Sequence, residues 1–449
     1  MYETMKAEIA IFENQIQNQK LRAMFHNCFY NTLDTTVEFV NDDDVYLLTG
    51  DIPAMWLRDS SASVIQYIDF AKTDEDVYRL IKGLIHRQFF YISVDPYTNA
   101  FNKEPNGAGH TQDEGLRAPY TWERKFEIDS LCYPMWLIHR LYHTTHKKEL
   151  LDERFVKTCK IIMDVFKKEQ RHHKLSDYYH YREGEKEGFN IPNHGKGGEV
   201  AYTGMIWSGY RPSDDACKYG YFIPGNMFAV VALRFMHELL LEINENELAA
   251  EAQKIENEVE EGIQKYGIYH HPQFGDIYAY ETDGLGNYLL MDDANVPNLL
   301  SIPYFEYQSD ENEIYQNTRR FCLSKENPYY FEGKVLKGIG SPHTPDGYVW
   351  HIGIVLQALT SSDEKEIKEI INMVLSSDAG TNYTHEGINK DNPNEFTRAW
   401  FAWSNSLFAY LVLKSKKIDL WRKINDEKKI IKNVIDRSVS FYNGKLRNP

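Results

Sequence analysis

The sequence predicts an all-α fold, an (α/α)6 barrel in which six helical hairpins form a toroid, with short β-hairpins in its loops. Three observations predict it. An acid-bearing loop followed by an aromatic-rich helical segment recurs along the 449 residues. More polar helical segments alternate with these apolar ones. No Gly/Ser/Pro-rich linker divides the chain, so we expect one domain over residues 1–449, with a polar tail without motif from about residue 415.

The apolar segments are expected to form the inner ring. They are hydrophobic nearly all round, as helices packed on both sides are. The segments begin at Trp56 (WLRDSSASVIQYIDF), Lys125 (KFEIDSLCYPMWLIHRLY), Arg211 (RPSDDACKYGYFIPGNMFAVVAL), Met291 (MDDANVPNLLSIPYF), Asp346 (DGYVWHIGIVLQAL) and Glu395 (EFTRAWFAWSNSLFAYLVL).

The polar segments are expected to form the outer ring. Their apolar residues recur at three- and four-residue spacing, which is typical of one-sided surface helices. Clear examples are DEDVYRLIKGLIHRQFF, LLDERFVKTCKIIMDVFKK and ENELAAEAQKIENEVEEGIQKYG. Strands should be few: the alternation over residues 266–280 predicts a short hairpin, and residues 178–187 are a second candidate.

Composition and missing motifs exclude several function classes. A formal charge of −16 argues against a nucleic-acid partner. The five cysteines (Cys28, Cys132, Cys159, Cys217 and Cys322) show no C-x-x-C pair and are interpreted as buried thiols of a reducing compartment. Neither a signal peptide nor an apolar run of about 20 residues is found, so we expect a cytoplasmic protein without a membrane partner. Phosphate-loop, G-x-S-x-G and H-E-x-x-H motifs are also missing, and no cofactor or metal is expected.

The loops before the inner helices should converge at one end of the barrel and bring carboxylates together. Clustered carboxylates can divide acid and base roles, bind hydroxyl groups or bind a metal. The Trp and Tyr residues among them favour a sugar, because pyranose rings offer apolar faces. Hydrolysis of a glycoside requires two such carboxyl groups, one of them protonated.

Asp214 and Asp215 are the first candidates for these roles. They lie between Arg211 and Lys218 in a Trp- and Tyr-rich segment, which suits one raised pKa and one ionised partner. Helix capping by one or both is an equally good interpretation of the local pattern.

Other candidates carry comparable alternatives. Glu386 lies in the polar loop YTHEGINKDNPNEF and could be a solvated loop residue. Arg58, between Asp51 and Asp59 in DIPAMWLRDS, could be a sugar-hydroxyl clamp or a structural ion pair. His343, beside an aromatic helix, could line the site or be a structural histidine.

Together these segments resemble glycoside hydrolase family 125. DIPAMWLRDSSASVIQY, KFEIDSLCYP, MIWSGYRPSDDACKYGYFIPGNMFA, MDDANVPNLLSIPY and FTRAWFAWSNSLFAYLV occur in order over about residues 25–415. The resemblance implies an (α/α)6 barrel and a metal-independent exo-acting α-1,6-mannosidase that inverts anomeric configuration. Its expected partner is an oligosaccharide with terminal α-1,6-linked mannose. Oligomeric state is left open.

The resemblance also implies roles for particular residues. The general acid is Asp214 or Asp215, with Asp214 preferred, and the general base is Glu386, with Glu395 as the alternative. The matched WLRDS, FEID and MDDAN segments imply substrate contacts by Trp56, Arg58, Asp59, Glu127, Asp129, Asp292 and Asn295. Asp51, Arg211 and His343, from the loops around the same inner segments, are further expected contacts. Inversion requires room for a water, so the acid and base carboxyl groups should be about 6.5–9.5 Å apart.

Two other functions compete with hydrolysis on such a barrel, because a fold does not fix a function. An epimerase or lyase would act on the same sugars with different groups; an epimerase is expected to use histidines, whereas these loops offer carboxylates. A carbohydrate-binding protein could keep the pocket without turnover.

Overall fold

The computed structural model describes residues 1–186 and 188–415, and the predicted tail from about residue 415 lies almost entirely outside them. The predicted all-α class is confirmed. The inner elements are α3 (Leu57–Ala62) with the 3-10 helix η1 (Ile65–Lys72), α5 (Ile128–Thr145), α9 (Ile223–Glu242), α12 (His351–Leu359) and α14 (Ala402–Ser415). The outer helices are α2 (Gln19–Thr35), α4 (Glu75–Val94), α6 (Glu153–Glu169), α10 (Asn246–Tyr266), α11 (Glu313–Cys322) and α13 (Glu364–Ser376). Shorter helices are α1 (Glu3–Glu13), η2 (Lys148–Leu150), α7 (His172–Leu175) and α8 (Pro192–Gly195).

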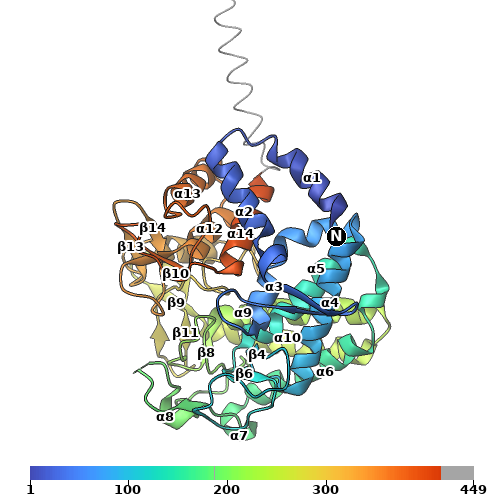
Figure 1. The fold of residues 1–449 in the computed structure, drawn as a ribbon. Helices are drawn as coiled ribbons and strands as arrows, with labels where there is room; N and C mark the ends of the chain where they lie inside the picture. Colours follow the sequence, from blue (N-terminus) through green and yellow to red (C-terminus); the bar gives the residue numbers. More distant parts are fainter. Residues whose placement is uncertain (187, 416–449) are drawn as a thin grey trace, which may run out of the picture.

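The inner elements contact one another in a closed order. Helix α5 packs between α3 and α9, and α14 packs between α12 and α3. The segment 292–309 completes the circle: the Phe305 ring contacts Phe228 of α9 at a centroid distance of 5.2 Å, and Ala294 lies against Gly353 of α12. Helix α2, in blue, and helix α14, in red, also pack together (Figure 1). The barrel is therefore a ring closed between its first and last hairpins.

A close backbone approach helps to close this ring. Gly50, before the first inner helix, pairs with Phe401, before the last. Gly50 has a φ of 147°, and a Cβ atom there would lie 2.4 Å from the carbonyl oxygen of Trp400. Only glycine fits, because it lacks the Cβ and tolerates this conformation.

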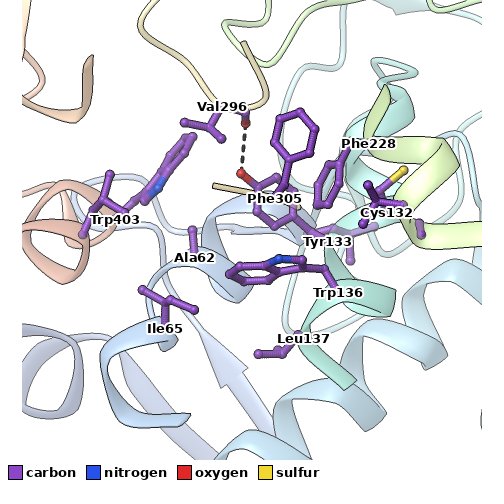
Figure 2. Packing of buried hydrophobic residues seen from close by; sticks show 14 of the residues in the cluster. Ala62, Ile65, Cys132, Tyr133, Trp136, Leu137, Phe228, Val296, Phe305 and Trp403 are labelled. Carbon is purple, nitrogen blue, oxygen red and sulfur yellow. Dashed lines mark hydrogen bonds between the residues drawn. The ribbon is translucent and has the colours of Figure 1, made fainter. Parts of the chain in front are cut away.

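Side chains of successive inner elements fill the centre of the ring. Figure 2 shows Ala62, Tyr133, Trp136, Phe228 and Trp403 packing around one another, although they come from four different helices. The hydroxyl group of Tyr133 donates a hydrogen bond of 3.0 Å to the Val296 carbonyl, which satisfies its one buried polar atom. The aromatic richness of the inner segments is thus used mainly for the core.

Inner and outer helices begin differently. Five outer helices have an Asn or Asp cap whose side chain accepts a backbone N–H: Asn18, Asp74, Asp152, Asn312 and Asp363. The caps of the inner helices α3, α5, α9 and α12 make no such bond. Neither Asp214 nor Asp215 caps α9, whose cap is Phe222. Polar side chains at the inner helix starts are therefore left to face the centre.

The segment from Met291 differs from the helix that its composition predicts. Residues 292–309 form turns rather than a helix. Pro297 and Pro303 remove two backbone donors, and the Val296–Pro297 peptide is cis. The Asp292 carboxylate accepts instead from the amides of Leu299 and Leu300, at 2.8 and 3.1 Å. This carboxylate replaces the intrahelical acceptors that a helix would have supplied.

Strands are short and confined to loops, as predicted. Antiparallel pairs join β1 (Val37–Asn41) to β2 (Asp44–Leu47), β5 (Asp113–Glu114) to β7 (Tyr181–Arg182), β9 (Ile268–His271) to β10 (Gly275–Tyr278), β13 (Tyr330–Glu332) to β14 (Lys337–Ile339), and β15 (Tyr348–Trp350) to β16 (Gly387–Asn389). Two three-stranded sheets contain β3 (Met55–Trp56), β4 (Ala100–Phe101) and β6 (Thr121–Glu123), and β8 (Tyr221–Phe222), β11 (Glu281–Thr282) and β12 (Tyr288–Leu289). The β9–β10 pair is the hairpin predicted over 266–280. The 178–187 candidate contributes one strand, β7, whose partner is β5.

Among the described helices, none is long and apolar enough to cross a bilayer.

Candidate active site

A cavity of about 300 Å³ lies at the inner helix starts, where the loops converge. This volume is at the lower end of the range for small-molecule sites, about 300–1,000 Å³. The lining residues are Thr49, Ile52, Trp56, Arg58, Asp59, Pro212, Ser213, Asp214, Asn295, His343, Trp350, Glu386, Arg398, Phe401 and Trp403. The four aromatic rings among them provide flat apolar walls, and the charged groups provide hydrogen-bonding partners. This mixture suits a small polar ligand with apolar faces, such as a pyranose.

The turn before α9 directs Asp214 and Asp215 to different places. The backbone of Asp214 is left-handed, with a φ of 65°, and its carbonyl accepts a hydrogen bond of 2.9 Å from Lys125. The turn is closed by a hydrogen bond from the Arg211 amide to the Asp215 carbonyl. As a result Asp214 lines the 300 Å³ cavity, whereas Asp215 lines a neighbouring cavity together with Arg211. Strained backbone of this kind is often found at functional sites.

Buried charges surround Asp214. The Arg58 guanidinium donates to Glu127 at 2.6 Å and to Asp129 at 3.0 Å, and it lies 3.8 Å from Asp214. Burial raises the pKa of Glu127 well above its usual range against the pull of Arg58, and the neighbouring carboxylates of Asp214 and Asp129 raise it further. Asp214 is also within hydrogen-bonding reach of Glu127. Glu127 therefore favours its protonated form, in which it can donate a hydrogen bond to Asp214.

Arg58→Leu is expected to destabilise the fold by about 3–5 kcal/mol, because it removes the buried guanidinium to which the carboxyl groups of Glu127 and Asp129 are paired. Urea unfolding followed by tryptophan fluorescence measures the change. Arg79→Leu is the matched control: it removes the exposed ion pair with Asp42, and it should cost less than about 1 kcal/mol. Equal losses in the two variants would contradict a buried ion-pair cluster.

Glu386 faces the same cavity from the loop before α14. Its Oε2 accepts a hydrogen bond of 2.9 Å from the Thr397 hydroxyl group, and its Oε1 lies 3.7 Å from Arg398. Arg398 also donates to Asp51 from its Nε atom at 2.9 Å. These partners hold the Glu386 side chain in position. Glu395 does not line the cavity; it is exposed and accepts from the side chains of Asn389 and Asn392.

His343 lies at the rim, with its Nδ1 atom 3.9 Å from the Asp215 carboxylate. Removal of water would lower the pKa of this ring, but Asp215 outweighs that effect and, with Asp214 and Glu386, raises the pKa to about 9. The imidazole is therefore protonated at neutral pH and adds a positive charge to the acidic site.

The His343 charge predicts a pH-dependent stability. Its pKa in the folded chain, about 9, exceeds the value of about 6.5 for a free histidine, so protonation stabilises the folded state. This contribution is complete below about pH 6.5 and disappears as the pH rises through 9. His343→Asn should therefore lower the melting temperature at pH 6 and have a much smaller effect at pH ~10, as measured by differential scanning fluorimetry. A decrease that is the same at both pH values would contradict this prediction.

The structure brings together only part of the predicted set. Trp56, Arg58, Asp59, Asn295 and His343 line the cavity with Asp214 and Glu386. Predicted contacts that lie elsewhere are Asp51, exposed and paired with Arg398; Glu127 and Asp129, buried behind Arg58; Arg211, paired with Glu281; and Asp292, buried beneath its loop.

Several cavity residues were not predicted. Trp350, Phe401 and Trp403 form walls, and Arg398 lies beside Glu386. Arg398 belongs to the FTRAW segment that resembles the family. Like Arg58, it lies close to the start of an inner helix, and this position could have identified it as a cavity residue. Asn99 was a further omission: its amide group lies 3.4 Å from Glu127 and 3.3 Å from Asp214.

Comparisons with known proteins agree with the geometry. The model of the metal-independent α-mannosidases, glycoside hydrolase family 125, matches residues 18–413. A Streptococcus pneumoniae enzyme of the metal-independent α-mannosidases, in a non-productive complex with α-1,6-mannobiose, is 40% identical, with a TM-score of 0.90 over 92% of this chain and 98% of that chain. The Meiotically up-regulated gene 157 protein of Schizosaccharomyces pombe is 36% identical over 89% of this chain and 83% of its own length.

A bacterial glucoamylase in complex with acarbose matches at 12% identity, with a TM-score of 0.52 over 80% of this chain and 48% of that chain. This likeness concerns the fold alone, and it supports the (α/α)6 toroid. The family match, by contrast, covers all the residues that line the cavity and extends into the last turn of α14. The chain therefore belongs to glycoside hydrolase family 125, the metal-independent α-mannosidases.

Proposed function

We propose that this α-mannosidase removes terminal α-1,6-linked mannose with inversion, using Asp214 as general acid and Glu386 as general base. The observation that carries the proposal is that Asp214 and Glu386 line one cavity of about 300 Å³ from two different loops, while Asp215 and Glu395 do not. Two carboxyl groups flanking one small site are the requirement of glycoside hydrolysis.

The surroundings of Asp214 suit an acid. Burial and the neighbouring carboxylates favour a protonated Glu127, which lies within hydrogen-bonding reach of Asp214 and can supply it with a proton. Asp214 is the partner that reaches the cavity, with a quarter of its side chain exposed (25%), so it is the group that can donate to a departing glycosidic oxygen. Glu127 acts through Asp214 and is a positioning residue.

The surroundings of Glu386 suit a base. The Thr397 hydroxyl donates to one of its oxygens and Arg398 lies near the other, so the carboxyl group is held facing the cavity, where it can remove a proton from water. In an inverting reaction this water attacks the anomeric carbon from the face opposite the leaving group, in the same step in which Asp214 protonates that group. The separation of about 6.5–9.5 Å that is typical of inverting pairs leaves room for the water.

The remaining cavity residues suit recognition of one mannose unit. Trp56 provides an apolar face, while Arg58, Asp59 and Asn295 offer partners for hydroxyl groups. Asp293 accepts hydrogen bonds from both the amide and the side chain of Asn295, at 2.8 and 2.9 Å, and so fixes the orientation of that side chain. The 40% identical Streptococcus pneumoniae enzyme with bound α-1,6-mannobiose supports the choice of linkage. Fragments of N-linked glycans, the glycans associated with that enzyme, are the proposed natural substrates.

Linkage and direction of attack are tested with defined oligosaccharides. The α-1,2-, α-1,3-, α-1,4- and α-1,6-mannobioses are incubated with the protein, and released mannose is measured by anion-exchange chromatography. Preferential cleavage of the α-1,6 isomer is expected. An α-1,6-mannotriose labelled at its reducing end should first yield labelled mannobiose. Early labelled mannose would contradict exo action, binding without release of mannose would favour a carbohydrate-binding protein, and isomerisation of free mannose would favour an epimerase-type activity.

A further inference from the structure

Two histidines and a glutamate converge on the molecular surface outside the cavity. His139 and His143 are four residues apart on α5 and therefore lie on the same face of that helix. Glu238 belongs to the neighbouring inner helix α9. Its Oε2 atom lies 3.2 Å from Nε2 of His139, and its Oε1 atom lies 2.8 Å from Nε2 of His143. Within residues 1–186 and 188–415, this is the one group of three such side chains whose donor atoms all lie within 4.8 Å of one another.

We propose that His139, His143 and Glu238 form a binding site for a divalent transition-metal ion, Zn²⁺ in the first place, that links α5 to α9. Imidazole nitrogens and a carboxylate oxygen are ordinary zinc ligands. With metal–ligand distances of about 2.0–2.1 Å, the donor atoms of a tetrahedral site lie about 3.3 Å apart. Each oxygen of Glu238 lies near one imidazole nitrogen, at 3.2 and 2.8 Å, and the three groups lie within 4.8 Å of one another, so rotation of the exposed His143 and Glu238 side chains would bring them onto one ion.

The site is partly preorganised. The His139 ring stacks on Phe235, one helical turn before Glu238, at a centroid distance of 3.6 Å and an interplanar angle of 9°. This contact holds the ring against α9, and the side chain is only 13% exposed. His143 and Glu238 are more exposed, at 44% and 47%, which leaves an approach for the ion and coordination positions for water. Three protein ligands with an open position are common in zinc sites.

The site is separate from hydrolysis. His139 follows Asp129, at the cavity end of α5, by ten residues, which is about 15 Å along a helix. A metal here would clamp two packed helices and stabilise the folded state, without touching the mannose site. The proposal is therefore compatible with metal-independent catalysis.

Calorimetry with Zn²⁺ itself tests the proposal. The tag-free full chain is stripped with EDTA, dialysed and titrated with ZnCl₂ at pH ~7.5, where free histidines are mostly neutral. One zinc per chain is expected for the unaltered protein. Loss of a residue that only hydrogen-bonds to a metal ligand lowers metal affinity about 10–100-fold. His143→Gln and Glu238→Gln each remove a ligand itself, so each should lower the zinc affinity by at least about tenfold. Both residues are exposed, so both variants should fold.

His270→Gln is the matched control. His270 is an exposed histidine paired with Asp276 at 2.8 Å, but among the described residues it belongs to no group of three potential metal ligands. This variant should bind zinc like the unaltered protein, and zinc should raise the melting temperature of both but not of the two ligand variants. Absence of binding, or equal binding in all variants, would overturn the site. The rate of mannose release should be the same with zinc and with EDTA. A protein that binds zinc at this site but releases no mannose would contradict the proposed function and not the metal site.

Discussion

Asp214→Asn is expected to lower kcat on α-1,6-mannobiose by about 10²–10⁴-fold, the usual contribution of a general acid or base. The amide cannot donate the proton that the departing glycosidic oxygen needs. Asp215→Asn should lower it far less, because Asp215 is buried between Ser213 and His343 and lines the neighbouring cavity. Steady-state kinetics on the two variants measure the difference. A larger loss in Asp215→Asn would reassign the acid.

A substrate with a different leaving group distinguishes loss of the acid from misfolding of the variant. A dinitrophenyl α-mannoside has a leaving group that departs without protonation. Asp214→Asn should therefore keep most of its activity on this substrate, while its activity on the disaccharide falls. Equal losses on both substrates would mean that Asp214 serves the structure of the site rather than proton donation.

Glu386→Gln is expected to lower kcat by a similar factor, about 10²–10⁴-fold, for a different reason. The amide cannot remove a proton from the attacking water, and this need does not depend on the leaving group. The loss should therefore be equally large on mannobiose and on the dinitrophenyl mannoside. The pair of substrates thus distinguishes the base from the acid.

Glu395→Gln is the matched control for the base. Glu395 lies nine residues further along the chain and hydrogen-bonds Asn389 and Asn392 in an exposed turn. Its replacement should leave kcat within a few-fold of the unaltered value. A loss comparable to that of Glu386→Gln would return Glu395 to consideration as the base and remove the assigned role of Glu386.

Residues that share a helix start were predicted together from the sequence. Trp56, Arg58 and Asp59, which the family resemblance implied as substrate contacts, belong to the first turn of α3 or its cap, and the predicted inner ring directs that turn to the centre. The same logic anticipated Glu127 and Asp129 at the start of α5, but not that both would lie behind Arg58 as its buried partners. Helical periodicity predicts the face of a residue; it does not predict which charges will pair on that face.

The orientation of adjacent loop residues could not be predicted. Asp214 and Asp215 separate because Asp214 adopts a left-handed backbone, which depends on contacts to Lys125 and within the turn from Arg211. These contacts join segments far apart in the sequence. Arg398, also left-handed with a φ of 48°, reaches Glu386 for a similar reason.

The prolines of segment 292–309 predict turns, although its apolar composition predicts a helix. Its apolar residues resemble those of the inner helices, yet Pro297 and Pro303 interrupt any helix there. These turns also affect the cavity, because they orient Asp293, which in turn fixes the cavity residue Asn295 by hydrogen bonds. Proline spacing within an apolar run therefore carried more information about the site than its hydrophobicity.

The central claim, that Asp214 and Glu386 act on opposite faces of a single mannose unit, is tested most directly by the configuration of the first product. Fresh protein is mixed with α-1,6-mannobiose, and the anomeric protons are followed by NMR before mutarotation equilibrates them. The account predicts that β-mannose appears first and that α-mannose follows only by mutarotation. Early release of α-mannose would contradict it, because retention requires a nucleophile and a carboxyl separation of about 5–5.5 Å instead of a water between base and sugar.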